Sequence, residues 1–475
     1  MVDVTELNIG IIGMGEMGKM YARRFAAGGM KRIYVCDRPE RFEQVKEEMS
    51  GEPAIIVMKD GHHVSRISDF IIYSVEAAYI NDVVKEYGPS TKMNSIVAGQ
   101  TSVKAPEKEA FEKYLPADVH IVSIHSLHGP TVTTEGQPLV IIKYRATDAQ
   151  VETVVEIFKS FKSNYVHLSY EEHDLVTANT QAVTHAAFLS MGTAWKETSD
   201  YPWETTRYVG GIEIVKINIT LRIYSNKWHV YAGLAILNPS AREQIGTYAD
   251  SSTQIFKLMI EEKKEELRER MFAAREGVFG WTRQEGSEQN GIASGSGSTP
   301  DKAVPADGKD HSSSSSKPRT ARKPILLSDR ILDQFSLGVK PEPGQGARPN
   351  SHLSLMAMVD CWHRLGIKPY DHLDVAGTPV FMLWIGVAEY LFRSPERLEA
   401  AIEAAIYDKT HRSDDTEFCI AARGWSQCVS FGNFDLYRDR FEQTASFFAP
   451  RFEEAAKVGG KMIKTIQEES KRTTT

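Results

Sequence analysis

A glycine-rich stretch near the N-terminus constrains the fold more than any other feature of the chain. Gly13, Gly15 and Gly18 match the pattern G-x-G-x-x-G, after the apolar run Asn8–Ile12 and at the start of the helix-like segment Glu16–Ala27. The first glycine permits a tight turn, the second lets the backbone approach a pyrophosphate, and the third lets the helix pack on the strand. In this context the glycines predict a dinucleotide bound at the N-terminus of a helix.

The residues after the second predicted strand bear on which dinucleotide binds. Asp37 follows Gly18 by 19 residues, where a carboxylate accepts a hydrogen bond from a ribose 2′-hydroxyl, which favours NAD. Arg38, beside it, could instead hold a 2′-phosphate, which favours NADP, and these residues alone leave the choice open. The cofactor-binding residues that we expect are Gly13, Met14, Gly15, Glu16, Met17, Gly18, Asp37, Arg38 and Ser74.

Short apolar runs alternate with amphipathic segments over the first third of the chain, which predicts βαβ units and a parallel sheet. Thr147 with Gln150, and Ser169 with Glu172, have the spacing of capping boxes, so a helix should begin at each. The predicted strands are Asn8–Ile12, Ile33–Cys36, Ala54–Met58, Phe70–Val75, Ser95–Ala98, His120–Ile124 and Leu139–Ile142, and the helix-like segments between them include Arg38–Met49 and Glu107–Leu115.

Helical patterns dominate after Ser169. Residues 284–323 are rich in Ser, Gly and Pro and almost lack large apolar side chains, so we expect a disordered surface insertion there. We therefore expect a dinucleotide-binding domain at 1–168 and a helical domain at 169–283 and 324–475, divided by the insertion. Beyond the insertion the expected helices are Ser351–Leu365, Phe381–Phe392, Pro395–Ala405 and Phe441–Ile466.

Composition narrows the classes of partner. The net charge of −7 gives no sign of a nucleic-acid or membrane-surface partner, and no run approaches the ~20 apolar residues of a membrane span. The four cysteines lack paired or metal-like spacing. Together with an N-terminus that has no signal-like pattern, these features predict a reduced, cytoplasmic protein.

A second motif, VSIHSLHGP at 122–130, places His125 at the end of a predicted strand. Ligands of open α/β sheets lie at the carboxyl ends of the strands, so His125 is a candidate for catalysis, although a purely structural histidine fits the pattern equally well. His125 and His128 have H-x-x-H spacing, but no third ligand is evident, so we expect no metal. The motif GQTSVK at 99–104 brings Ser102 and Lys104 to the same edge of the sheet.

Two further segments carry candidate polar residues. TQAVTHAAF, at 180–188, is helix-like and places Gln181, His185 and Phe188 on one face, although a core helix with one satisfied histidine fits the same pattern. LRIYSNKWHVYAG, at 221–233, places Arg222, Asn226 and His229 on one face if it is helical. The alternating isoleucines before it indicate a strand instead, so the pattern is ambiguous.

Taken together, GIIGMGEMG, GQTSVK, VSIHSLHGP, EEHDLVTANTQAVTHAAF and LRIYSNKWHVYAG resemble the prephenate dehydrogenases, specifically the fungal NADP-dependent enzymes of tyrosine biosynthesis. The resemblance extends beyond the insertion, to NSHLSLMAMVDCW and GVAEYLF. It implies a Rossmann domain followed by an all-helical domain that dimerises, with prephenate as substrate and NADP as cofactor. It also favours a helix at Leu221.

The resemblance implies roles for individual residues. His125 matches the catalytic histidine, with Ser102 and Lys104 as polar residues beside it. Arg222 matches the arginine that binds a substrate carboxylate, and His185, with Gln181 on the same helix face, a histidine of the substrate pocket. One departure is Ser126, because bacterial members usually have proline after the catalytic histidine.

Three alternatives remain open at the level of sequence. Arogenate, the amino analogue of prephenate, differs from it only in the side chain, whose reader the sequence does not identify. A β-hydroxyacid dehydrogenase would carry a lysine on the helix where Gln181 and His185 lie. A dinucleotide sensor without turnover would share the fold alone.

Overall fold

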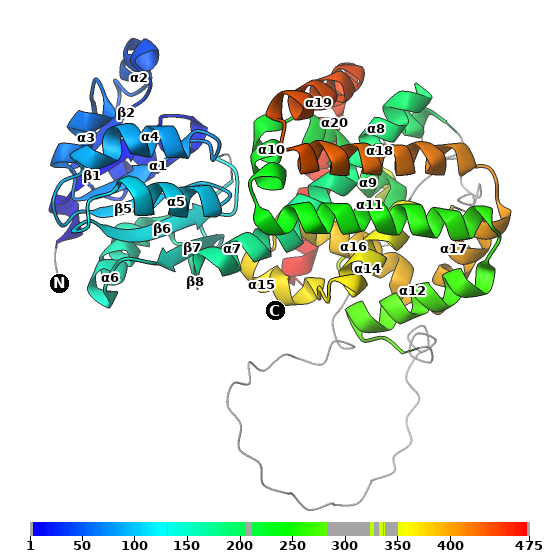
Figure 1. The fold of residues 1–475 in the computed structure, drawn as a ribbon. Coiled ribbons are helices and arrows are strands. Elements are labelled where there is room, and N and C mark those ends of the chain that lie inside the picture. The colour runs from blue at the N-terminus through cyan, green and yellow to red at the C-terminus, as the bar shows by residue number, and fades with distance from the viewer. Residues whose placement is uncertain are drawn as a thin grey trace, which may run out of the picture.

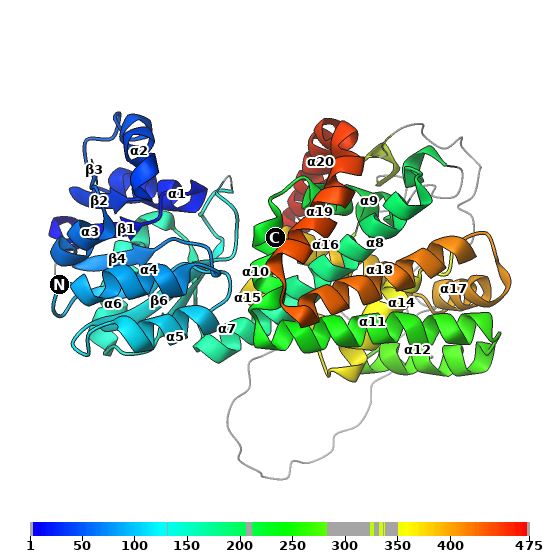
Figure 2. The same cartoon turned by 45° about the horizontal axis from the view of Figure 1, so that its top comes forward.

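The computed structural model describes residues 3–130, 132–205, 211–282, 324–326, 332–335, 337 and 350–472. An N-terminal domain built on a sheet lies beside a larger helical domain, with α7 (Tyr170–Thr177) at the junction (Figures 1 and 2). This is the predicted fold class, a Rossmann-type domain followed by an all-helical region. The last strand ends at His167 and α7 begins at Tyr170.

Within the described residues the sheet has eight strands, in the order β3-β2-β1-β4-β5-β6-β7-β8. The neighbours from β3 to β6 pair in parallel, as predicted, but β7 is antiparallel to β6 because the described part of their connection contains no helix to carry the chain back. The sequence pattern did not indicate β8, whose side chains are at most half-buried. The strands are β1 (Asn8–Ile12), β2 (Arg32–Cys36), β3 (Ile55–Val57), β4 (Phe70–Tyr73), β5 (Ile96–Gly99), β6 (His120–Ser126), β7 (Pro138–Lys143) and β8 (Asn164–His167).

Helices cover both faces of the sheet, and each face has its own apolar core. Phe25, Phe158 and Phe161 pack together with Tyr21 on one face, whereas Tyr73 contacts Phe111 on the other. The helices of this domain are α1 (Glu16–Ala27), α2 (Phe42–Glu48), α3 (Gly61–Ile67), α4 (Ile80–Tyr87), α5 (Ala105–Tyr114) and α6 (Asp148–Ile157). The predicted capping boxes at Thr147 and Ser169 are confirmed.

The helical domain shares one large apolar core. A π-helical turn at Ala178–Ala182 joins α7 to the next helix without a break. The helices are α8 (Val183–Thr198), α9 (Ile212–Tyr224), α10 (Trp228–Ile236), α11 (Pro239–Ile260), α12 (Lys264–Phe279), α14 (Leu353–Arg364), α15 (Leu373–Ala376), α16 (Pro379–Arg393), α17 (Pro395–Tyr407), α18 (Arg412–Phe431), α19 (Phe434–Phe448) and α20 (Phe452–Arg472).

Two expectations about helices need correction. The single helix expected at Phe441–Ile466 is divided into α19 and α20 by a 3-10 turn at Ala449–Arg451, because Pro450 cannot continue an α-helix. The segment at 221–233 is helical at Leu221, as the resemblance implied, but α9 ends at Tyr224 and α10 begins only at Trp228. The expected insertion at 284–323 lies outside the described residues.

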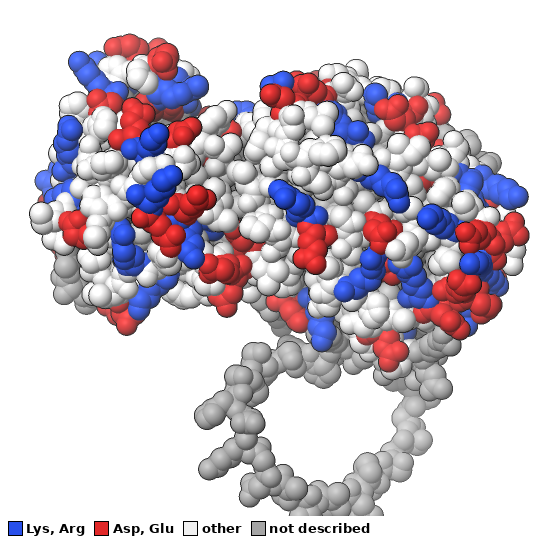
Figure 3. Space-filling model, in the orientation of Figure 1, with Lys and Arg blue, Asp and Glu red and all other residues white. Residues whose placement is uncertain are grey.

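Other features of the described residues agree with the composition. All four cysteines are free and buried. Within this part of the chain, no helix is long and apolar enough to cross a membrane. Positive and negative side chains are interspersed over the face shown in Figure 3, so that face offers no broad surface of one charge.

The carboxyl ends of β4 and β5 meet the helical domain. Ala77 and Val103, which follow these strands, pack into the core of the helical domain. Glu76 lies 3.5 Å from His229 of α10, and the Asn238 side-chain amide donates to the carbonyl of Asp174 at 2.8 Å. The edge of the sheet where ligands bind in such folds is therefore the edge that faces the junction of the domains.

Candidate active site at the junction of the domains

The glycine turn between β1 and α1 has the geometry that the motif predicted. Gly13 has a φ of +101°, and a Cβ there would lie 2.3 Å from the carbonyl oxygen of Ser74. A Cβ on Gly18 would lie 2.1 Å from the carbonyl oxygen of Gly13, so helix and strand pack as closely as the backbone allows. A Cβ on Gly15 would meet nothing within 4 Å. The turn is therefore closed behind Gly13 and open at Gly15, where a pyrophosphate would approach.

The remaining residues of the turn divide into a buried and an exposed group. Met14 is fully buried in the core of the domain, whereas Met17 is half-buried. The Glu16 side chain is exposed and pairs with Lys19 at 3.2 Å. No described side chain caps the start of α1 at Gly15, so the first N–H groups of the helix keep their positive dipole end for an anion.

Asp37 ties the end of β2 to the glycine turn. Its Oδ2 accepts hydrogen bonds from the backbone N–H of Met14 at 2.9 Å and from Arg41 Nη1 at 2.7 Å, and its Oδ1 accepts from the backbone N–H of Arg38 at 2.7 Å. The Arg38 side chain is exposed and has no hydrogen bond or ion pair among the described residues. Arg41 was not predicted, although its i,i+4 spacing from Asp37 was a signal for the pair. Two guanidinium groups therefore follow β2, where the 2′ position of a dinucleotide would lie.

His125 lies near the end of β6 and is only 6% exposed. Its Nδ1 lies 2.8 Å from Nε2 of His173, and His173 Nδ1 lies 3.0 Å from Oδ1 of Asp174. Burial lowers the pKa of both imidazoles well below their usual value, with a further contribution from the positive charge of Lys104. Both rings are therefore neutral near pH 7, which is the form in which His125 can accept a proton.

Asp174 is anchored at the start of α5. Its Oδ1 accepts the backbone N–H of Lys104 at 2.7 Å and its Oδ2 accepts that of Ala105 at 2.8 Å. Burial raises the pKa of Asp174 to about 6, against these two hydrogen bonds, so the carboxylate is ionised above that pH. Sequence analysis missed His173 and Asp174 as site residues, because their contact with His125 spans 48 residues of sequence.

The structure does not place Lys104 where the resemblance implied. Its side chain is fully buried, and Nζ donates to the carbonyls of Gly99 and Ile124 at 2.9 and 2.8 Å, to Glu107 Oε2 at 2.8 Å and to Ser123 Oγ at 3.1 Å. These acceptors occupy the ammonium, which therefore joins the ends of β5 and β6 instead of lying free in the crevice. The burial of an ion pair with no exposed atom is rare, and charge in the sequence gave no sign of it.

Two hydroxyls lie close to the predicted catalytic histidine in the chain. Ser102 is half-buried in the loop after β5, and its hydroxyl has no hydrogen-bond partner among the described residues. Ser126, which follows His125 in place of the proline of bacterial members, shares a hydrogen bond of 2.7 Å with Tyr21 of α1. The loop that follows β6 is thus fastened to α1, the helix of the glycine turn.

The predicted substrate-binding residues form a second group, on the helical domain. His185 packs edge-on against Tyr231 with ring centroids 4.8 Å apart, and its Nδ1 is buried with no hydrogen-bond partner among the described residues. Burial lowers the pKa of His185 to about 4. Arg222 is exposed near the end of α9, and its carbonyl accepts from Asn226 Nδ2, which also donates to the Tyr231 hydroxyl.

Gln181 is half-buried in the π turn that precedes α8, whereas Phe188 faces the core and contacts Trp384. The expectation that residues 181, 185 and 188 share one face is therefore wrong for Phe188. No hydrogen bond or ion pair between described residues joins His125 to His185 or Arg222. The two groups belong to different domains and flank the junction between them.

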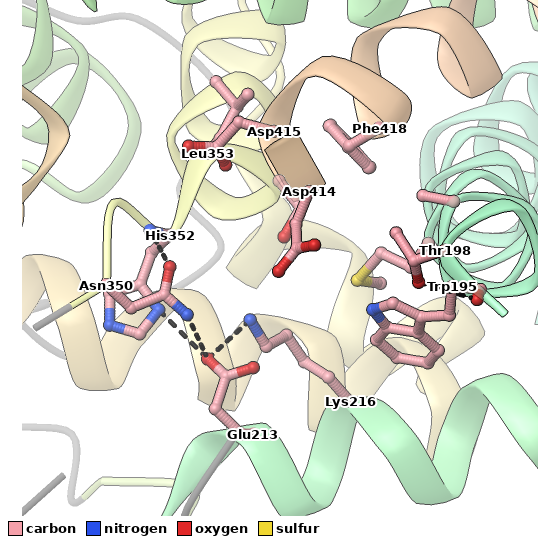
Figure 4. A pocket seen from close by; sticks show the side chains of 13 residues that line it. Trp195, Thr198, Glu213, Lys216, Asn350, His352, Leu353, Asp414, Asp415 and Phe418 are labelled. Carbon is pink, nitrogen blue, oxygen red and sulfur yellow. Dashed lines mark hydrogen bonds and ion pairs between the residues drawn. The ribbon is translucent and has the colours of Figure 1, made fainter. Parts of the chain in front are cut away.

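A separate pocket of about 50 Å³ lies inside the helical domain (Figure 4). Lys216 and His352 converge on Glu213 there, with Nζ 2.6 Å and Nδ1 3.2 Å from its Oε1. Although burial acts to raise the pKa of Glu213, these two groups lower it to about 2. The volume suits a few water molecules, and none of the predicted site residues lines it. Among the described residues, no cluster of His, Cys, Asp and Glu could hold a metal ion.

Two family models match the chain. One is described as a 6-phosphogluconate dehydrogenase C-terminal domain and matches residues 182–291 and 311–468. The other, described as NADP oxidoreductase, coenzyme F420-dependent, matches residues 8–99. The first match therefore corresponds to the helical domain and the second to the part of the sheet that contains the glycine turn.

Individual relatives cover nearly the whole chain. Prephenate dehydrogenase (NADP+) of Saccharomyces cerevisiae is 49% identical over 465 residues, 96% of this chain and 93% of the relative. A Schizosaccharomyces pombe protein named probable prephenate dehydrogenase (NADP+) is 48% identical over 460 residues, 97% of each chain. A solved prephenate dehydrogenase of Aquifex aeolicus, in complex with hydroxyphenyl propionate and NAD+, is 19% identical with a TM-score of 0.46, over 55% of this chain and 94% of that one. The chain belongs to the family of the prephenate dehydrogenases, which are oxidoreductases.

Proposed function

We propose that this chain catalyses the NADP+-dependent oxidative decarboxylation of prephenate to 4-hydroxyphenylpyruvate. The observation that carries the proposal is the near-complete match to two fungal relatives named for this activity. The buried, neutral His125 at the carboxyl edge of the sheet supports it independently, because the reaction needs a proton acceptor beside a bound dinucleotide. The open turn at Gly15 and the uncapped start of α1 fit the pyrophosphate of such a cofactor.

The reaction asks three things of the protein. When bound, NADP+ supplies the acceptor for the hydride that leaves C4 of the substrate. His125 takes the proton of the C4 hydroxyl, while the electron pair of the O–H bond forms the new C=O bond. The ring carboxylate then leaves as CO2 because its departure makes the ring aromatic, so the protein needs no further acid or base for that step. Ser102 is the candidate for a hydrogen bond to the same oxygen.

Binding and orientation fall to the helical domain in this proposal. Arg222 clamps a substrate carboxylate with its planar guanidinium, and His185 and Gln181 line the same pocket. The exposure of Arg222 in the free chain leaves its donors available for a ligand. Beside Asp37, Arg38 and Arg41 take the 2′-phosphate that distinguishes NADP from NAD.

We propose in addition that the enzyme is a cytoplasmic homodimer joined through its helical domain. Three large apolar side chains of α17 and α18 are exposed in the single chain: Tyr407 at 61%, Ile420 at 59% and Phe431 at 74%. Covering such side chains with a second copy would remove them from water. Sedimentation of a compact monomer at micromolar concentration would contradict this part of the proposal.

One assay tests the activity. Purified protein is mixed with NADP+ or NAD+ and with prephenate, arogenate or a panel of β-hydroxyacids, and formation of the reduced cofactor is followed. We expect turnover with prephenate and NADP+ above all other pairs. Preference for arogenate or for a hydroxyacid would replace the substrate, and binding of NADP+ without turnover of any substrate would indicate a sensor.

A further inference from the structure

A chain of three side chains runs from the candidate base into the body of the protein. His125 Nδ1 contacts His173 Nε2 at 2.8 Å, and His173 Nδ1 contacts Asp174 Oδ1 at 3.0 Å. His125 and His173 are 6% and 1% exposed, so water does not compete for these contacts. The residues come from β6 and from the first turn of α7, which is the helix at the junction of the domains.

The direction of each hydrogen bond follows from the last member. The Asp174 carboxylate already accepts two backbone N–H groups and, when ionised, has no proton to give. His173 Nδ1 must therefore carry the proton and donate it to Asp174. A neutral imidazole has one N–H, so His173 Nε2 is an acceptor, and the proton between the two rings belongs to His125 Nδ1. The lone pair of His125 is then on Nε2, which has no hydrogen bond to any described residue.

We propose that His173 and Asp174 are positioning residues that hold His125 in the tautomer with a proton on Nδ1 and a free lone pair on Nε2. Nε2 is thereby the atom that accepts the substrate proton, an assignment that rests on the proposed function. The ring is held in orientation by the same bond. A buried base in the other tautomer would present an N–H to the substrate hydroxyl and could not accept its proton.

The surrounding charges explain why the carboxylate is set behind a second ring. His125 faces His173 of α7, Lys104 at the start of α5 and His128 of the following loop, and each of these opposes a positive charge on His125. Asp174 brings the compensating negative charge, while its contacts with the backbone of Lys104 and Ala105 fix it at the N-terminus of α5. The neutral His173 ring keeps the carboxylate from pairing with His125 directly, so the base keeps a low pKa and stays neutral.

The tautomers can be measured in the unmodified protein. Nitrogen-15 NMR of protein labelled at histidine distinguishes protonated from unprotonated ring nitrogens, and the His125 and His173 signals are assigned by their loss in His125→Asn and His173→Gln. We expect Nδ1–H and an unprotonated Nε2 for both rings above pH 7. An N–H on Nε2 of His125 would overturn the proposal whatever the variants do.

Kinetics test whether the pair acts through His125. His173→Leu removes the acceptor for His125 Nδ1–H, and we expect kcat to fall by about 10²–10⁴, as when a general base loses its tautomer, with little change in KM. His173→Gln retains a carbonyl acceptor and should restore kcat to within about tenfold of the unmodified enzyme. Glu171→Gln, which removes an exposed carboxylate from the same turn, is the matched control and should leave kcat and KM unchanged.

The outcomes separate the two proposals. If His125→Asn loses kcat but His173→Leu, folded at the assay temperature, keeps it, the positioning role is refuted and the proposed base survives. If His125→Asn itself keeps kcat, the assignment of the base fails first. Equal losses in His173→Leu and His173→Gln would indicate a merely structural role for His173 and would also refute the inference.

Discussion

Replacing Lys104 with methionine tests whether its ammonium is a structural or a catalytic group. The side chain is fully buried, and all its acceptors lie within 3.1 Å of Nζ. Methionine fills similar space but leaves the Glu107 carboxylate and two strand-end carbonyls without their donor. Removing one partner of a buried ion pair costs about 3–5 kcal/mol of the free energy of unfolding. At roughly 2–4 °C per kcal/mol for a domain of this size, Tm should fall by roughly 6–20 °C.

The assay for Lys104→Met combines urea and thermal unfolding with kinetics well below the lowered Tm. Lys108→Met is the matched control on the same helix, because its pair with Glu171 is at the surface and should contribute at most about 1 kcal/mol. The double variant Lys104→Met with Glu107→Gln should regain part of the lost stability, since it no longer buries an unpaired carboxylate. In the single variant, the acid limb of kcat should move to higher pH because a positive charge near His125 is gone.

The reasoning would be refuted by the opposite pattern. If Lys104→Met unfolds like the unmodified protein but loses kcat by a hundredfold or more, the ammonium contacts the substrate or the cofactor, as the resemblance implied. If Lys108→Met is destabilised as strongly as Lys104→Met, burial is not what makes the Lys104 pair important.

Four further results are expected. His125→Asn should lower kcat by about 10²–10⁴ and abolish an acid limb that, in the unmodified enzyme, lies below pH 6.5 because burial lowers the pKa of His125; an unchanged limb would assign the base elsewhere. Arg222→Ala should mainly raise KM for prephenate, and a selective loss of kcat would contradict a binding role. Arg38→Ala and Arg41→Ala should each weaken NADP+ binding, measured by calorimetry, more than NAD+ binding, and equal losses would rule out contact with the 2′-phosphate. The pKa of His185 falls from 6.5 unfolded to about 4 folded, so its neutral form stabilises the protein fully above pH 6.5 and this contribution, up to about 3 kcal/mol, is lost as pH falls to 4; urea unfolding of His185→Gln should show a flatter dependence over that window.

Local patterns predicted the parts of the molecule whose causes are local. The glycine turn, the strands β1 to β7 and the two capping boxes each depend on residues a few positions apart. The break at Pro450 was equally local and was visible in the sequence, since proline removes a donor from the helix. The antiparallel β7 follows from the missing helix before it, which a pattern of alternating elements does not reveal by itself.

The features that were not predicted depend on contacts between distant segments. His173 reaches His125 across 48 residues, and its role is set by a neighbouring carboxylate that is anchored on another helix. Lys104 would ordinarily be exposed, and only the packing of β5, β6 and α5 around it makes it an internal group. Arg41 becomes a partner of Asp37 because the chain turns helical directly after β2.

The π turn at Ala178–Ala182 sets how the two domains share one site. In an uninterrupted α-helix, positions 173 and 185 would differ by about 120° around the axis, since each residue turns the chain by about 100°. A π turn accommodates one extra residue without that rotation, which reduces the difference to about 20°. The continuous helical segment that carries His173 thus presents His185 on nearly the same side. Deleting a single residue from the turn would keep every side chain of the site and rotate half of them away from the other half.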